Sequence, residues 1–254
     1  MIQKKFINPF GYALAFLRLL IIILTLAFIV GVGITLHKLG LLQQRHAFTI
    51  RSLYCKWALF ILGVRVHKSG KLDLTPGTLY VGNHRSLVDP IVVFAYLTNG
   101  YAIGKVEVSK YPLINTGAML SGVIYVDRDC ANSRKSTREA IADLLSKGMS
   151  VLVFPEGTIS TEVKAKQFRQ GTFHAAAATK RPIVTFALEM GDPGRDFWYG
   201  DGLFNLYFQS FSKWRTEVYL HFFEPILGNS GEELTLQAAE MVGGKLEEFQ
   251  KNWK

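Results

Sequence analysis

Residues 78–90 read TLYVGNHRSLVDP, a stretch that contains a strand, a loop and a helix start in direct succession. The β-branched and aromatic residues of Thr78–Val81 predict a strand that ends at Gly82-Asn83. A proline disfavours the α conformation in the residue before it and is favoured at the first helical position. We therefore expect Asp89 to be the N-cap of a helix that runs from Pro90 to about Leu97.

His84 lies on the loop of this stretch, five positions before Asp89. Because the helix is expected to start only after Asp89, the loop can fold the His84 ring back onto the carboxylate. An aspartate that accepts from one ring nitrogen fixes the tautomer and leaves the other nitrogen free to remove a proton from a hydroxyl. In the alternative interpretation Asp89 only caps the helix, and His84 is a surface loop residue.

Further strands and helices alternate after residue 71. Short apolar runs predict strands at Thr78–Val81, Gly122–Val126, Ser150–Phe154, Pro182–Leu188 and Glu217–Phe223. A capping-box pattern at Ser136–Glu139 and a stop at Lys147-Gly148 indicate a helix between Val126 and Ser150. A last helix is expected from about Glu232 to Gln250. This alternation favours a sheet covered by helices.

Two more segments place polar residues at the ends of predicted strands. Residues 154–158 read FPEGT, and a functional interpretation puts Glu156 and exposed backbone N–H groups beside a polar head group. Residues 122–128 read GVIYVDR and present Arg128 at the carboxyl edge of the sheet, where an arginine suits a phosphate. Lys105 adds a second candidate cation. The alternatives are an ordinary Pro-Glu-Gly turn and solvated basic residues.

The net charge of +9 is concentrated at the N-terminus. Residues 1–70 hold nine basic and no acidic residues, whereas the remaining 20 basic residues balance all 20 acidic ones. Positive charge interleaved with a very apolar sequence is what an anionic membrane surface attracts. A nucleic-acid partner is disfavoured because residues 71–254 are neutral overall.

An uncharged run from Leu19 to Leu36 would reach roughly 27 Å as a helix, just short of a bilayer core of about 30 Å. A transmembrane helix, a re-entrant helix and an uncleaved signal anchor are all compatible with it. Basic residues flank both ends and fit a segment that enters and returns on the cytosolic side. With Leu53–Val64 as an interfacial helix, residues 1–70 are expected to form a two-helix membrane anchor and residues 71–254 an α/β domain; a single-pass anchor is the alternative.

Cys55 and Cys130 form neither a disulfide framework nor a zinc-binding spacing, which favours a reducing, cytosolic setting. The sequence also lacks a P-loop, a dinucleotide-binding glycine pattern and an H-E-x-x-H motif. No G-x-S-x-G elbow is present, so covalent serine catalysis of the lipase kind is disfavoured.

Taken together and in this order, these segments resemble the glycerolipid acyltransferase family, which includes the bacterial 1-acylglycerol-3-phosphate acyltransferases. The first block of the family is similar to Asn83–Asp89, the second to Gly122–Arg128 and the third to Phe154–Thr158. The proline-containing fourth block is similar to Arg181–Thr185. Residues 168–174, which read FRQGTFH, resemble the F-K-x-G-A-F-H continuation of the family. The resemblance covers roughly residues 75–225.

The resemblance implies an α/β fold with a mixed sheet flanked by helices and an N-terminal two-helix membrane anchor. It implies that His84 is the general base and Asp89 its partner. Lys105 and Arg128 would bind the acceptor phosphate, and Glu156 and Gly157 would line the acceptor site. The implied reaction moves a fatty acyl chain from acyl-CoA or acyl carrier protein to the free hydroxyl of 1-acylglycerol-3-phosphate, giving phosphatidic acid. It needs no metal or other cofactor, and the active site is expected on the cytosolic face of a membrane.

One position departs from the family, whose third block commonly reads F-P-E-G-T-R-S, whereas this chain has Ile159 in place of the arginine. The departure removes a candidate cation and gives weight to other acceptors, such as a lyso-aminolipid or a lysophospholipid. A lipid hydrolase or transacylase and a non-catalytic membrane lipid-binding protein are the rival functions. His174 and His221 are interpreted as structural.

Overall fold

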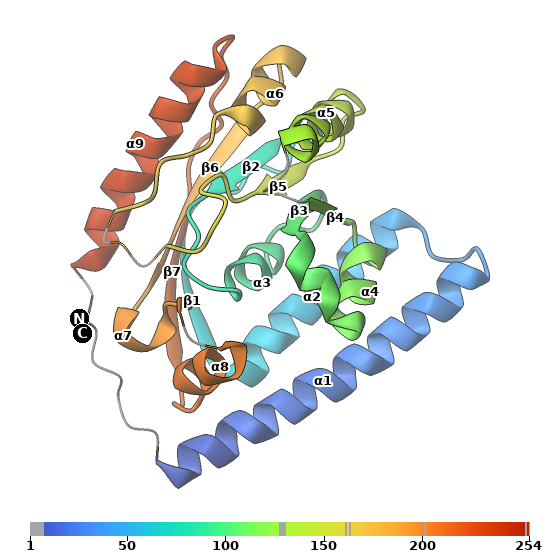
Figure 1. Cartoon of the computed structure of the whole chain (residues 1–254), viewed down its shortest axis with the longest axis vertical. Coiled ribbons are helices and arrows are strands. Elements are labelled where there is room, and N and C mark those ends of the chain that lie inside the picture. Colours follow the sequence, from blue (N-terminus) through green and yellow to red (C-terminus); the bar gives the residue numbers. More distant parts are fainter. Residues whose placement is uncertain are drawn as a thin grey trace.

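A computed structural model gives the structure of the chain and describes residues 8–126, 131–160, 162, 164–200, 202–251 and 253. Within them, one sheet has the strand order β1-β7-β6-β2-β5-β3-β4 (Figure 1). Its strands are β1 (Val64–Gly70), β2 (Leu79–Gly82), β3 (Tyr101–Lys105), β4 (Val123–Val126), β5 (Val151–Val153), β6 (Ile183–Met190) and β7 (Thr216–Phe222).

The sheet is mixed. Strands β6, β2, β5, β3 and β4 are parallel to one another, whereas β7 is antiparallel to β6 and parallel to β1. The carboxyl ends of the parallel strands therefore lie at one edge of the sheet. This arrangement confirms the predicted α/β fold with a mixed sheet flanked by helices.

Helices cover both faces of the sheet (Figure 1). Helices α5, α6 and α9 pack on one face, and α2, α3 and α8 pack on the other, with α1 outside α2. The helices are α1 (Pro9–Lys38), α2 (Gln44–Leu62), α3 (Asp89–Phe94), α4 (Pro112–Leu120), α5 (Ala131–Ser146), α6 (Gly171–Thr179), α7 (Pro193–Asp196), α8 (Leu203–Phe211) and α9 (Gly231–Gln250), together with a 3-10 turn at Val106–Lys110.

Alternate residues of each central strand fill two separate cores. Leu79 and Val81 of β2 point to the core beneath α5, α6 and α9, whereas Tyr80 belongs to the core beneath α2, α3 and α8. This follows from the two-residue period of a strand. Because helices cover both faces, β2 is apolar on both, and this explains why its sequence shows no polar alternation.

The five strands predicted from the sequence are present within one to two residues, and two further strands were not predicted. Strand β1 follows directly on the apolar helix α2 and is rich in polar residues, since most of its side chains are exposed at the edge of the sheet. Strand β3 contains Gly104 and ends at Lys105. In both segments the signal that distinguishes a strand is weak.

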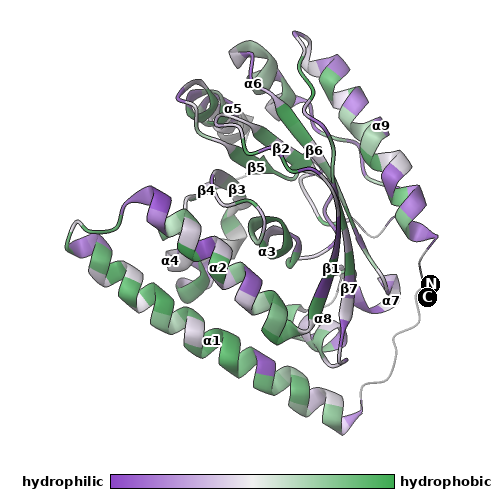
Figure 2. Ribbon diagram, turned by 180° about the vertical axis from the view of Figure 1, so that it is seen from behind, coloured by the Kyte–Doolittle hydropathy of each residue, from purple (hydrophilic) through white to green (hydrophobic). Residues whose placement is uncertain are grey.

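Helix α1 is the single helix among the described residues that is long and apolar enough to cross a membrane, judged by length and composition. Figure 2 shows it as an outer helix that is hydrophobic over most of its length. Arg18 interrupts the apolar surface, and its guanidinium donates to the carbonyl oxygens of Phe211 (2.9 Å), Lys213 (2.7 Å) and Trp214 (3.0 Å). These bonds hold α1 to the turn between α8 and β7.

The N-terminal region is not separated from the α/β domain at residue 70. The expected second anchor helix, Leu53–Val64, lies mostly in α2, whose side chains Cys55, Leu59 and Leu62 are buried in the core of the sheet. Residues 64–70, also assigned to the anchor, form β1 and pair with β7. The domain therefore begins before residue 71, because the apolar residues of α2 pack against α3 and the sheet.

Candidate active site

The chain reaches the carboxyl edge of the sheet at Gly82 and Asn83, where strand β2 ends. A Cβ atom at Gly82 would lie 2.3 Å from the ring of Phe186, so only glycine allows this approach. The Asn83 side chain then acts like a further strand residue: its Nδ2 donates to Leu188 O (2.7 Å) and its Oδ1 accepts from Leu188 N (2.8 Å). Both groups are buried, so the start of the loop is fixed by paired polar atoms.

The ring of His84 meets the carboxylate of Asp89 across this loop. His84 Nδ1 lies 2.7 Å from Asp89 Oδ2, and Asp89 is fully buried. The ring stacks on Phe154, with ring centroids 4.3 Å apart and an interplanar angle of 22°. The His84 side chain keeps 12% of its surface exposed, and its Nε2 has no hydrogen-bond partner in the described part of the chain. This nitrogen is thus open to a substrate.

Asp89 does not occupy the predicted N-cap position. Helix α3 begins at Asp89 itself, and the N-cap residue is Val88. The Asp89 carboxylate accepts from backbone groups that precede it, Arg85 N and Ser86 N, and from Ser86 Oγ. The loop therefore wraps around the carboxylate, which holds the loop in place and orients the His84 ring.

Glu156 reaches the same loop from the turn after β5. Its Oε1 accepts from His84 N (3.1 Å), while its Oε2 has no partner within the residues described. The turn is closed by Gly157 N donating to Phe154 O (3.1 Å), and Gly157 adopts a positive φ of 75° that favours glycine. Burial raises the pKa of Glu156 from an ordinary 4.5 to about 7, against the hydrogen bond from His84 N and the charge of Arg85.

This raised pKa predicts a pH-dependent effect of Glu156→Gln on stability. The folded protein keeps the Glu156 proton up to about pH 7, whereas the unfolded chain releases it near 4.5, so stability falls as pH rises through this window. Glutamine does not titrate and keeps the acceptor for His84 N. Relative to wild type, the free energy of unfolding of the variant should rise between those two pH values by on the order of 3 kcal/mol.

Thermal unfolding of both proteins in detergent micelles, followed by circular dichroism at about pH 5 and about pH 8, measures this difference. A difference in unfolding temperature that stays constant with pH would show that the Glu156 carboxyl ionises normally.

Arg85 connects the His84 loop to the rest of the site, although it was not among the predicted site residues. Its fully buried guanidinium donates from Nη2 to Glu189 Oε2 (2.9 Å) and from Nη1 to Glu162 O (2.6 Å). Ser160 N in turn donates to His84 O (2.9 Å). The segments after β2, after β5 and in β6 are thereby connected through one loop. The sequence feature that could have identified Arg85 is its position inside the first block, between His84 and Asp89.

The structure gives less information on the other two predicted site residues, Lys105 and Arg128. Lys105 is the last residue of β3, two strands from β2 in the sheet and at the same carboxyl edge. Arg128 lies outside the described residues. Together, the structure brings His84, Asp89, Glu156 and Gly157 into one site. Among the described side chains, no group of three or more His, Cys, Asp or Glu is arranged to hold a metal ion.

A histidine oriented by a buried aspartate at the carboxyl edge of a mixed α/β sheet is an arrangement that can perform general-base chemistry. The family model described as Acyltransferase matches residues 63–189, which is half of the chain. The chain belongs to this family.

Its relatives include the 1-acyl-sn-glycerol-3-phosphate acyltransferase of Cocos nucifera, with 30% identity over 51% of this chain and 43% of that protein. The protein of the same name from Borreliella burgdorferi is 22% identical over 57% of this chain and 59% of its own length. The chain spans about half the length of the curated relatives it matches.

The crystal structure of the 1-acyl-sn-glycerophosphate (LPA) acyltransferase PlsC from Thermotoga maritima superposes with a TM-score of 0.75. The superposition covers 95% of this chain and 97% of the PlsC chain, and the two sequences are 22% identical. This likeness concerns the fold.

Proposed function

We propose that the protein is a membrane-associated O-acyltransferase that transfers a fatty acyl chain from an acyl thioester to the free hydroxyl of 1-acylglycerol-3-phosphate, giving phosphatidic acid. The observation that carries this proposal is the oriented His84 ring, whose Nδ1 is bound to buried Asp89 and whose Nε2 is open. The names of the relatives support the choice of acceptor.

In the proposed reaction, His84 Nε2 removes the proton of the acceptor hydroxyl while the oxygen attacks the thioester carbonyl. The carbon–sulfur bond then breaks, and the thiol leaves with the proton or as a thiolate. Asp89 holds the ring and stabilises the imidazolium that forms. Acyl-CoA and acyl carrier protein both supply such a thioester, and no metal or prosthetic group enters the reaction.

A different lyso-lipid acceptor is the second candidate, because Ile159 stands where the family commonly has an arginine and packs against the core. An acceptor panel separates the two. Purified protein is mixed with labelled acyl-CoA or acyl carrier protein and with lysophosphatidate, other lysophospholipids or lyso-aminolipids, and the products are identified by mass spectrometry. Phosphatidic acid as the main product is the expected result. Release of free fatty acid without an acylated lipid would indicate a hydrolase instead.

We also propose that α1 attaches the protein to the cytosolic leaflet of a membrane, with α2 as the part of the anchor that joins the domain. Arg18 binds the turn after α8, and further along α1 a Cβ atom at Gly117 of α4 would lie 3.0 Å from Val30. Both contacts keep α1 along the domain, which supports an anchor that enters and returns on one side. The outward face of α1 carries exposed Phe16, Leu24 and Phe28.

Membrane attachment through this face is tested by Leu24→Glu. A carboxylate in place of a leucine that contacts lipid removes apolar contact and adds a charge, so partitioning into anionic vesicles should fall about tenfold or more. Flotation of the protein with phosphatidylglycerol-containing vesicles measures it. The matched control is Leu236→Glu on α9, since Leu24 and Leu236 are 60% and 65% exposed. Equal losses in both variants would contradict the assignment of the α1 face.

A further inference from the structure

The third block of this chain supplies no cation to the site at position 159. Ile159 is partly buried and packs against the apolar core that contains Phe154 and Phe186. A phosphate on the acceptor would therefore need another positive group beside this turn.

Arg169 lies against the turn, although it is distant from it in the sequence. A Cβ atom at Gly157 would be 2.7 Å from Arg169 Cζ, 2.8 Å from its Nε and 2.9 Å from its Nη2, so the guanidinium rests directly on the glycine. The backbone fixes this approach, because Arg169 N donates to Pro155 O (3.0 Å). Any side chain at position 157 would displace the guanidinium, and this gives the glycine a second role besides its positive φ.

Within the part of the chain that the structure describes, the guanidinium of Arg169 makes no hydrogen bond or ion pair. The residue is exposed, and across the described residues its side chain has no carboxylate or carbonyl acceptor. Arg85, by contrast, is buried and bonded to Glu189 and to backbone carbonyls. Arg169 therefore presents a fork of charged donors that suits the oxygens of a phosphate monoester.

The turn against which Arg169 lies is also the turn that contacts the His84 loop. Glu156 precedes Gly157 and accepts from His84 N. In 1-acylglycerol-3-phosphate the reacting hydroxyl and the phosphate ester sit on adjacent carbons, so the phosphate has to be bound close to His84. We propose that Arg169 binds the phosphate of the acceptor and replaces the cation that Ile159 removes; this inference rests on the proposed function.

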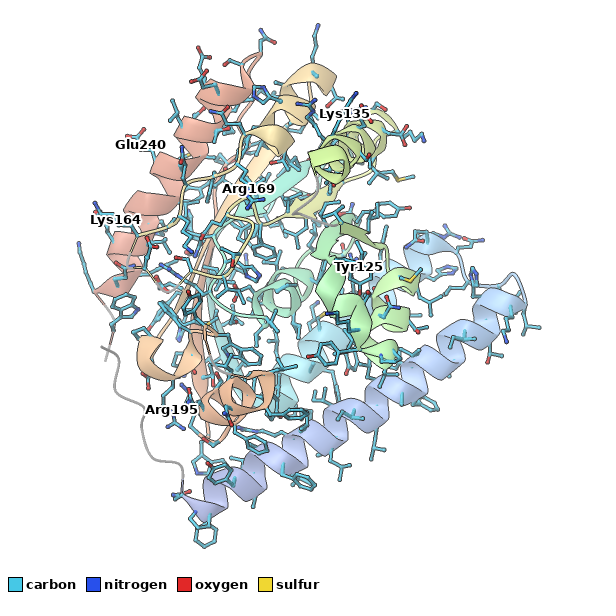
Figure 3. The ribbon with its side chains drawn as sticks, in the orientation of Figure 1. Tyr125, Lys135, Lys164, Arg169, Arg195 and Glu240 are labelled. Carbon is cyan, nitrogen blue, oxygen red and sulfur yellow. The ribbon has the colours of Figure 1, made fainter. Side chains whose placement is uncertain are left out.

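The other labelled cation of the same loop does not share this position. Figure 3 shows Arg169 over the strands of the sheet, whereas Lys164 lies toward α9, away from Arg169. Lys164 is exposed and belongs to the same segment between β5 and α6. Its replacement by glutamine therefore removes the same charge from the same loop, at a place that Figure 3 shows apart from Arg169.

Steady-state kinetics of Arg169→Gln, Arg169→Lys and Lys164→Gln test the proposal. The protein is the full chain in detergent micelles, with lysophosphatidate and monoacylglycerol as acceptors. For Arg169→Gln, the KM for lysophosphatidate should rise about tenfold to hundredfold with kcat little changed. Transfer to monoacylglycerol, which lacks the phosphate, should be unaffected. Arg169→Lys should retain part of the affinity, and Lys164→Gln should behave as wild type.

Each contrary outcome has its own meaning. An equal rise of KM for both acceptors, or an equal effect of Lys164→Gln, would overturn the proposal in favour of a general effect. A rise of the KM for the acyl donor alone would assign Arg169 to a phosphate of the donor and overturn the acceptor assignment. If wild type acylates no lyso-lipid at all, the proposed function itself fails; if it does and Arg169→Gln leaves KM unchanged, only this inference fails.

Discussion

Replacing His84 by alanine is expected to lower kcat for acyl transfer by about two to four orders of magnitude. The Nε2 atom is the one open nitrogen of a ring whose other nitrogen is held by Asp89, and alanine provides no group that accepts the hydroxyl proton. The KM for the acceptor should change little, because the proposed phosphate contact does not involve the ring. Initial rates with radiolabelled acyl-CoA at saturating acceptor give kcat.

The fold of His84→Ala should be retained, since the main contacts of the loop are made by Asn83, Arg85 and Asp89. A matched control is His221→Ala on β7, whose Nδ1 likewise has a side-chain partner, the hydroxyl Ser69 Oγ, at 2.8 Å. That variant should keep most of its activity. If His84→Ala remains within tenfold of wild type while folded, His84 is not the general base, and a non-catalytic or differently catalysed function follows.

Asp89→Asn is expected to lower kcat by about two to four orders of magnitude with only a modest loss of stability. An asparagine can place its oxygen where Oδ2 accepts from His84 Nδ1, Arg85 N and Ser86 N, and its amide can donate to Ser86 Oγ. The geometry of the loop is then kept, while the negative charge that stabilises the imidazolium is lost. The expected loss of kcat therefore comes from the missing charge and not from a change in structure.

Two further variants separate these contributions. Asp89→Ala leaves the Arg85 and Ser86 N–H groups buried without an acceptor, so its unfolding temperature should fall well below that of Asp89→Asn. Ser86→Ala removes the hydrogen bond from Ser86 Oγ to the Asp89 carboxylate but keeps the two backbone donors to it, and should cost less than about tenfold in kcat. Rates and unfolding temperatures of the three variants are compared in the same detergent. An active Asp89→Asn would mean that the carboxylate serves only to hold the loop.

Much of the fold could be predicted because its buried strands have short apolar sequences bounded by turn residues. Strand β1 was not predicted, since it is an edge strand whose polar side chains follow an apolar helix without a break. For the same reason, residues 64–70 were grouped with the anchor, whereas the structure pairs them with β7. Hydrophobicity alone does not tell whether the residues of α2 face lipid or a protein core, and their partners on α3 are distant in sequence.

The pairing of His84 with Asp89 could also be predicted from the proline that follows the aspartate. The N-cap assignment was wrong because backbone groups of the preceding loop, and not those of the helix, bind the carboxylate. Arg85 was not selected, because a buried arginine and a solvated one look alike in a sequence; its partner Glu189 is 104 residues away. Lys105 and Arg128 stay predictions as phosphate-binding residues.

Three successive backbone N–H groups, those of His84, Arg85 and Ser86, all point at carboxylates of the protein: the first at Glu156 and the other two at Asp89. Backbone N–H groups that lie close together can bind an anion, and many proteins use such groups for phosphate. Here these N–H groups already donate to the chain's own acidic side chains. In the proposed reaction these three N–H groups are therefore not available to the acceptor phosphate, whose recognition would depend on side-chain cations and could change through single substitutions without disturbing His84.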